Sequence, residues 1–157
     1  MPTRKFLGII LLLVAAGLAI FLIFRRQEKI PEIALQETRE YHSAELGFKL
    51  SYPATWVVEA AGMGNGTIIF TNPANYQEEV VVIVVDKSVE QELLTQAGNA
   101  DVASTTLASY SATELIPKEG SEIQGHIVYA VIGEKLFLLT GTSDEFNAVV
   151  ASFQLLE

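Results

Sequence analysis

The sequence contains two histidines, His42 and His126, and these side chains are the first candidates for acid–base or metal chemistry. Neither has a second histidine at the spacing that would place two ligands on one face of a helix or strand. A serine nucleophile would need a histidine base and a Gly-x-Ser-x-Gly turn, and the sequence has no such turn. We therefore expect two partly exposed histidines and no catalytic residue.

Two acidic pairs, Glu78-Glu79 and Asp144-Glu145, have structural explanations. Neighbouring side chains on a strand point to opposite faces, and the dipole of a helix favours acidic residues in its first turn. The glycine-rich segment Gly62 to Gly66 lacks the Lys-Ser/Thr of a phosphate-binding loop. Cysteine is absent, which excludes thiol catalysis, zinc fingers and a lipid-bearing cysteine. We therefore expect no cofactor and no metal site.

Charge is unevenly divided along the chain. Residues 1–40 hold six Lys or Arg against four Glu, whereas residues 41–157 hold four Lys against fifteen Asp or Glu. The second part thus has a net charge of −11, which repels phosphate backbones, so we expect no nucleic-acid binding. The acidity either keeps this part soluble or attracts a basic partner or loosely held divalent cations.

An apolar segment without charge runs from Phe6 to Phe24. As a helix it would span about 28 Å, close to the thickness of the hydrocarbon core of a bilayer. We interpret it as an uncleaved single-pass anchor in contact with the lipid bilayer, because a signal-peptide apolar region usually ends after roughly 7 to 15 residues. A cleaved signal peptide is the alternative. The predicted organisation is an anchor over residues 1–26, a linker over 27–40 and a domain over 41–157.

Positive charges flank the anchor on both sides, with Arg4 and Lys5 before it and Arg25, Arg26 and Lys29 after it. The two counts nearly cancel under the positive-inside rule. A short N-terminal tail commonly stays in the cytoplasm, and the acidic domain has few positive charges to hold it there. We therefore expect a cell-membrane protein whose domain lies outside the cytoplasm.

Alternating residues predict most of the strands. Phe48, Leu50 and Tyr52 alternate with polar residues up to Pro53, a second strand begins at Trp56, and Asn65-Gly66 predicts a hairpin that returns over Thr67 to Thr71. The block Val80 to Val85 is apolar throughout, which is typical of a strand covered on both faces. Further strands are predicted over Thr105 to Ile116, Ile123 to Ile132 and Lys135 to Thr140, the last two joined at Gly133-Glu134.

Two helices are predicted from capping boxes. Ser88 with Gln91 precedes a helix that would place Val89, Leu93, Leu94 and Ala97 on one side and end at Gly98. Thr142 with Glu145 precedes a helix with the apolar residues Phe146, Val149, Val150 and Phe153. Strands followed by a helix, strands and a helix predict an α+β sandwich, with helices packed on an antiparallel sheet.

The segment Gly47 to Trp56 (GFKLSYPATW), with Tyr41 upstream and Phe146 and Ala151-Ser152-Phe153 near the end, resembles the PsbP-like family. That family includes extrinsic subunits of the oxygen-evolving complex and many bacterial extracytoplasmic relatives. The resemblance implies an α/β/α sandwich with an antiparallel sheet, and a role in binding or assembling proteins without catalysis. None of the His or acidic positions of the photosynthetic members can be matched, so photosynthesis is not implied.

The remaining candidates are surface residues. Tyr41, Met63, Tyr76 and Tyr110 fall at predicted strand ends or loops, where they could contact a protein or complete the edge of the core. We expect a membrane-anchored module that binds an envelope protein. The alternatives are an envelope enzyme or small-ligand carrier whose pocket is made of dispersed residues, and a spacer domain without a ligand.

Overall fold

The computed structural model describes residues 37–60, 66–119, 123 and 125–156. The predicted anchor from Phe6 to Phe24 and the contact candidate Met63 lie outside these residues. In the part of the chain that is described, no helix has the length and apolar character needed to cross a membrane. One compact unit begins at Glu37.

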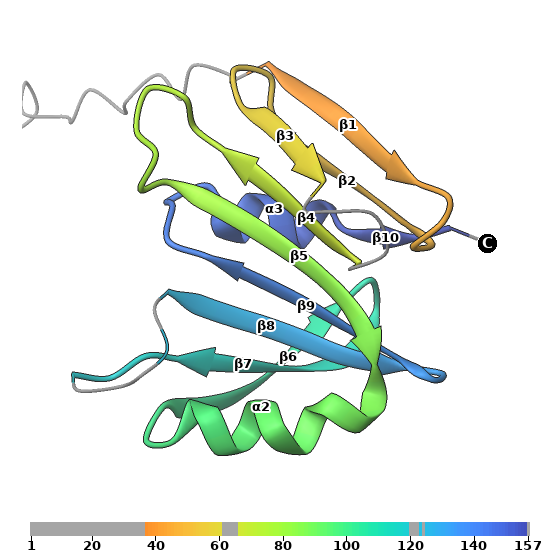
Figure 1. The fold of residues 1–157 in the computed structure, drawn as a ribbon, viewed down its shortest axis with the longest axis vertical. Coiled ribbons are helices and arrows are strands. Elements are labelled where there is room, and N and C mark those ends of the chain that lie inside the picture. The colour runs from red at the N-terminus through yellow and green to blue at the C-terminus, as the bar shows by residue number, and fades with distance from the viewer. Residues whose placement is uncertain (1–36, 61–65, 120–122, 124, 157) are drawn as a thin grey trace, which may run out of the picture. The chain divides into compact units, whose positions relative to one another are not determined.

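The described residues form two antiparallel sheets with few helices (Figure 1). The small sheet has the strand order β1-β2-β10, and the large sheet has the order β3-β4-β5-β9-β8-β7-β6. The strands are β1 (Thr38–Ser43), β2 (Phe48–Pro53), β3 (Val57–Ala60), β4 (Thr67–Thr71), β5 (Glu79–Asp86), β6 (Asp101–Leu107), β7 (Tyr110–Ile116), β8 (His126–Ile132), β9 (Lys135–Gly141) and β10 (Gln154–Leu155). The helices are the 3-10 helix η1 (Lys87–Val89), α2 (Glu90–Ala97) and α3 (Phe146–Ser152).

The first core fills the space between the two sheets. It contains alternate residues of β2, β4, β5, β8 and β9, together with Phe146 and Val149 of α3 and the following Phe153. The alternation predicted for β2 is confirmed, because Phe48, Leu50 and Tyr52 are all buried in this core. Burial of these side chains is the main force that holds the small sheet and α3 on the large sheet.

A second core lies on the opposite face of the large sheet, under α2. Its buried members are Ala97, Leu115, Ile127, Tyr129, Leu136 and Leu138. Strand β5 serves both cores, since Val80, Val82 and Val84 belong to the first, while Ile83 and Val85 pack against the second. The prediction of a strand covered on both faces is thus confirmed, and the two helices α2 and α3 contribute to opposite faces.

The predicted antiparallel return from β3 to β4 is also confirmed, whereas Asn65 of the predicted turn lies outside the described residues. The two strands pair antiparallel, with Val57 opposite Thr71 and Ala60 opposite Ile68. Gly66 enters β4 with φ +61°, and a Cβ at this position would lie 2.2 Å from the carbonyl oxygen of Val84. Only glycine fits here without movement of the backbone.

Both capping boxes are wrong, although the helices exist. The carboxylate of Asp86, two residues before Ser88, accepts the hydrogen bond from the Ser88 N–H and caps η1. The hydroxyl of Thr142 donates instead to the carbonyl oxygen of Gln77. The apolar face predicted for α2 is also partly wrong, since Val89 and Leu94 are exposed.

The predicted strand from Thr105 to Ile116 is a hairpin made of β6 and β7, which pair antiparallel from Asp101 opposite Ile116 to Leu107 opposite Tyr110. Leu107 and Ala112 both belong to the first core. In one continuous strand these two residues would face opposite sides, because they are separated by an odd number of positions. The hairpin reverses the direction of the chain and lets both face the core.

The small sheet was not predicted as a separate layer. Its strand β1 begins at Thr38, within the last residues of the predicted linker, and β10 follows directly after α3. Two strands in this sheet come from distant parts of the chain, with Leu155 opposite Phe48. The predicted architecture is therefore confirmed in that helices pack on an antiparallel sheet. It differs in that a second, smaller sheet covers one face of the large sheet.

Candidate protein-binding groove

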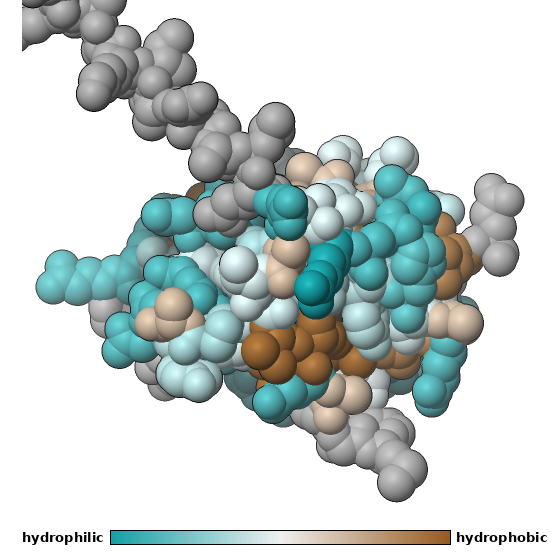
Figure 2. All heavy atoms as spheres, turned by 90° about the horizontal axis from the view of Figure 1, so that it is seen from above, coloured by the Kyte–Doolittle hydropathy of each residue, from teal (hydrophilic) through white to brown (hydrophobic). Residues whose placement is uncertain are grey.

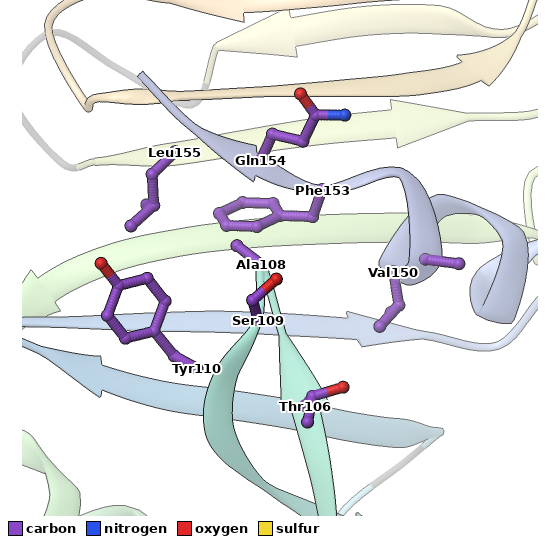
Figure 3. A pocket seen from close by; sticks show the side chains of 9 residues that line it. Thr106, Ala108, Ser109, Tyr110, Val150, Phe153, Gln154 and Leu155 are labelled. Atoms are coloured by element: carbon purple, nitrogen blue, oxygen red, sulfur yellow. The ribbon is translucent and has the colours of Figure 1, made fainter. Parts of the chain in front are cut away.

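A groove of about 710 Å³ lies between the β6–β7 turn and the segment that joins α3 to β10 (Figure 3). Its lining residues are Thr106, Ala108, Ser109, Tyr110, Val150, Ala151, Phe153, Gln154 and Leu155. None of these side chains is charged, and most are apolar or aromatic. The groove is therefore suited to an uncharged group that can meet both polar and apolar atoms.

The β6–β7 turn is a two-residue loop in an unusual backbone conformation. Leu107 pairs with Tyr110, and the two residues between them have positive φ angles, 49° at Ala108 and 71° at Ser109. Positive φ at both central residues is the geometry of a type I′ turn, which normally requires Asn-Gly or glycine. The left-handed region costs an ordinary residue roughly 1–2 kcal/mol. Backbone strain of this kind often marks a functional position.

Packing beneath the turn maintains this conformation. The side chain of Leu107 is 1% exposed in the first core, and Ala108 packs against that core. Because these contacts are lost if the turn rearranges, they offset the strain of the backbone. The turn thereby places Tyr110, which is 49% exposed, at the groove.

The opposite wall is built from the end of α3. Phe153 is 2% exposed and stacks on Phe48, with ring centroids 5.3 Å apart. The hydroxyl of Ser152 accepts a hydrogen bond from the Ser51 N–H at 2.9 Å, which ties the end of α3 to β2. The Leu156 N–H donates to the carbonyl oxygen of Gly47 at 2.9 Å just after β10. The wall is therefore fixed at several points.

The other predicted contact residues do not join Tyr110 in this groove. Tyr41 is half-buried and packs edge-on against Phe70, with ring centroids 5.4 Å apart, so it contributes to the edge of the core. Tyr76 is 77% exposed in the loop between β4 and β5, and it is not part of the groove lining. Met63 lies outside the described residues.

The loop that carries Tyr76 is organised by hydrogen bonds. The side-chain amides of Asn72 and Asn75 donate to the two carboxylate oxygens of Glu78 at 2.7 and 2.8 Å. These bonds favour the charged form and lower the pKa of the Glu78 carboxyl. The loop therefore presents Tyr76 on an ordered backbone, as a second exposed aromatic side chain.

The two histidines lie apart and do not form a catalytic or metal site. His42 pairs with Glu40 on β1, and Nδ1 of His126 lies 3.5 Å from Oε1 of Glu114. Both histidine side chains are about half exposed, at 54% and 45%. Among the described residues, no group of three His, Asp or Glu side chains could hold a metal ion.

His126 also lines a smaller hollow of about 360 Å³ next to the β9–α3 connection. The Oγ atom of Ser143, which lines the same hollow, is buried and has no hydrogen-bond partner among the described residues. Among the described residues no hydrogen bond joins Ser143 to His126, so the contact that activates a serine nucleophile is missing. The hollow therefore provides polar atoms for a small ligand and not a nucleophile.

Single apolar residues are exposed elsewhere on the surface. Val57, Val89, Leu94, Val102 and Val131 are exposed, and they come from five different elements. Figure 2 shows one face of the molecule, on which hydrophobic atoms are surrounded by hydrophilic residues. Isolated exposed apolar residues are common on soluble domains, so they do not define a site by themselves.

The fold and the groove together define an antiparallel α+β sandwich without a recognisable catalytic group among its described residues. The sequence profile of the PsbP family matches residues 36–132, which is more than half of the chain. The protein therefore belongs to the PsbP family. The resemblance inferred from Gly47 to Trp56 is confirmed by this match.

Several solved structures are similar to this chain, and two of them illustrate the likeness. The solution structure of cyanobacterial PsbP (CyanoP) from Synechocystis sp. PCC 6803 has 12% sequence identity and a TM-score of 0.49, over 82% of this chain and 98% of that one. A crystal structure from Bacteroides thetaiotaomicron VPI-5482 has 15% identity and a TM-score of 0.50, over 78% of this chain and 50% of that one. The latter likeness concerns the fold alone. No curated protein matches the sequence.

Sequence reasoning found Tyr110 but missed the rest of the groove. Phe153 was assigned to the apolar face of a helix, and Leu155 lies in a two-residue strand that is too short to recognise from alternation. Ala108 and Ser109 carry no signal of a type I′ turn, because neither is glycine, asparagine or aspartate. The only available signal was the odd spacing of Leu107 and Ala112 within one supposed strand.

Proposed function

We propose that the protein is a single-pass membrane protein that presents its PsbP-family domain outside the cytoplasm as a non-catalytic module for binding or assembling envelope proteins. The observation that carries the proposal is the uncharged groove, in which a strained turn holds Tyr110 beside a fixed apolar wall. Aromatic side chains on a rigid support are typical anchors of protein interfaces. Membership of the PsbP family supports a binding role over an enzymatic one.

The membrane part of the proposal rests on the sequence. The apolar segment from Phe6 to Phe24 supplies the anchor, and the acidic domain supplies the argument for its orientation. Protease added to intact cells, or to spheroplasts, tests both points with a tag at the C-terminus. Loss of the full-length band is expected. Cleavage only after lysis would place the domain in the cytoplasm.

The groove is tested by a pair of matched variants, Tyr110→Ala and Tyr76→Ala. Both remove an exposed tyrosine, but only Tyr110 lines the groove. Protein is crosslinked in gently solubilised membranes, and the recovered partners are quantified for each variant. We expect Tyr110→Ala to reduce recovery of the partner by about tenfold or more, the effect of losing one interface anchor. Equal recovery from both variants would contradict a role for the groove.

A small-ligand carrier remains the second candidate, because the volume of the groove lies within the roughly 300–1,000 Å³ of small-molecule sites. A shift in thermal unfolding with a panel of neutral metabolites, abolished by Tyr110→Ala, would favour this candidate. A binding module without a small ligand predicts no such shift, since only binding to the folded state raises its stability.

A further inference from the structure

The four outer strands of the two sheets are not equally protected against pairing with another chain. An outer strand exposes unpaired backbone N–H and C=O groups, and proteins usually shield them by short length, charge, proline or a cover. Strand β10 has two residues and β3 has four, and β3 includes the charged Glu59. Strand β1 carries Arg39, Glu40 and His42. Each of these three edges therefore has a protective feature.

Strand β6 has none of these features along most of its length. It has seven residues, Asp101 to Leu107, and among the described residues it pairs with β7 alone. Its one charged residue, Asp101, is at the first position and is paired with Lys118 at 2.5 Å. The following residues are Val, Ala, Ser, Thr, Thr and Leu, which include three with high β-propensity and no proline. Its Val102 is 65% exposed.

The groove lies at the end of this unprotected edge. Thr106 of β6 lines it, and so do Gln154 and Leu155 of β10, which is an outer strand of the small sheet. Figure 3 shows the β6–β7 turn pointing toward the α3–β10 segment. A segment that extended along β6 would therefore reach this uncharged groove with its end.

We propose that β6 receives an extended segment of the partner protein as an added strand, and that an apolar or aromatic side chain of this segment enters the groove beside Tyr110. This inference rests on the proposed function and specifies the form of the partner. Backbone hydrogen bonds to β6 provide affinity, and the groove provides specificity, as in other complexes formed by strand addition. Seven residues offer an edge of about 24 Å at ~3.4 Å per residue.

Charge argues for a basic or neutral partner segment over a second copy of this chain. Residues 41–157 of each copy hold four Lys against fifteen Asp or Glu, so two copies side by side would repel each other. The groove itself is lined by uncharged residues, so the inserted side chain needs no charge. The occupant we propose is therefore an extended segment without acidic residues, with apolar side chains at alternate positions.

The absence of cysteine from the sequence allows a direct test in the full-length protein in its own membranes. Single cysteines are introduced by Val102→Cys, Ser104→Cys, Thr106→Cys and, for the groove, Ser109→Cys, which leaves Tyr110 in place. All four positions are exposed, so folding should persist, which thermal unfolding verifies. Glu59→Cys is the matched control, because Glu59 is also exposed and lies on β3, the opposite edge of the large sheet. Each thiol is labelled with a photoactivatable crosslinker, and adducts are mapped by mass spectrometry.

Strand addition predicts that positions 102, 104 and 106 crosslink to partner residues that step by two along one segment, in a constant direction. Adducts at Ser109→Cys alone would overturn strand addition and leave the proposed binding function intact. Adducts between two copies of this chain would overturn the choice of occupant. No adduct from any of the four positions would overturn both proposals, and equally strong adducts from Glu59→Cys would overturn the role of β6.

Discussion

Two hairpin turns of the large sheet have the same length and are supported in different ways. The β8–β9 turn consists of Gly133 and Glu134, between the paired residues Ile132 and Lys135. The β6–β7 turn consists of Ala108 and Ser109, between Leu107 and Tyr110. The first has glycine where φ is +64°, whereas the second has positive φ at two ordinary residues. The second turn depends on its surroundings to remain in this conformation.

The surroundings of the two turns differ accordingly. At the β8–β9 turn, the side chain of Lys87 forms an ion pair with Glu134 at 2.9 Å. The backbone N–H of Lys87 also donates to the carbonyl oxygen of Glu134 at 3.0 Å. At the β6–β7 turn, the support comes from Leu107 and Ala108 against the first core. The turn beside the groove is therefore stabilised by buried apolar contacts, and the other by glycine and exposed polar contacts.

The largest expected effect is at the apolar support of the β6–β7 turn. Leu107→Ala should lower the free energy of unfolding by about 2–4 kcal/mol, because it leaves a cavity in the core and removes the contact that offsets the strain. The matched variant Ile132→Ala, before the other turn, should cost less, since Ile132 is only half-buried. Urea unfolding measures both. A larger loss for Ile132→Ala would show that the two turns do not differ as described.

A smaller effect is expected at the glycine of the β8–β9 turn. Gly133→Ala should lower stability by about 1–2 kcal/mol, the cost of a left-handed conformation for a residue with a Cβ. Strain is the whole of this effect, because nothing lies within 4 Å of the added Cβ. Gly47→Ala is a suitable control, since it also has positive φ and open space around it. Unchanged stability in both variants would contradict the role assigned to backbone conformation.

The reverse substitution should stabilise the β6–β7 turn. In Ser109→Gly the relief of about 1–2 kcal/mol of strain exceeds the ~0.5–1 kcal/mol entropic cost of glycine, which leaves a gain of roughly 0.5 kcal/mol. The same variant separates strain from binding. If packing against the core alone positions Tyr110, Ser109→Gly should recover as much crosslinked partner as the wild type. A marked loss of recovered partner would show that the strained backbone itself is required.

The contrast between the turns also explains what the sequence could predict. Gly133-Glu134 was located because glycine is a local signal, and β2, β4, β5 and β9 were located because their residues alternate or are apolar throughout. The Ala108-Ser109 turn has no local signal, since its conformation is imposed by Leu107 in the core. Both helices were predicted from capping boxes and the apolar residues that follow them. The boxes are wrong because the hydrogen bonds of these side chains depend on tertiary contacts, such as the bond from Thr142 to Gln77.

The same distinction applies to the candidate site. Tyr110 was recognisable as an exposed aromatic residue at the end of a strand, but Leu155 reaches the groove only because β10 pairs with the distant β2. Contacts between residues about a hundred positions apart, such as Ser51 with Ser152, leave no pattern in a single sequence. The groove could therefore not be assembled from the sequence, although one of its residues could be named.

The smallest expected effect is a pH dependence of local stability at the β8–β9 turn and not at the β6–β7 turn. Hydrogen bonds from the side chain and backbone of Ser88 lower the pKa of the Asp86 carboxyl. Asp86 lies opposite Lys135, the first residue after the turn, in the register of β5 and β9. A carboxyl whose pKa is lower in the folded state stabilises that state above its unfolded pKa, and the contribution is lost as the pH falls through the folded pKa. In the wild type, protection of the Glu134 and Lys135 amides against hydrogen exchange should therefore rise with pH in the range below about pH 4. In Asp86→Asn this rise should be less steep. Glu45→Gln, which removes an exposed charge from the β1–β2 turn, is the control for net charge.

The amides of Ser109 and Tyr110 should keep the same protection in Asp86→Asn as in the wild type, because apolar packing does not titrate. A parallel change at these amides would mean that the two turns open as one unit.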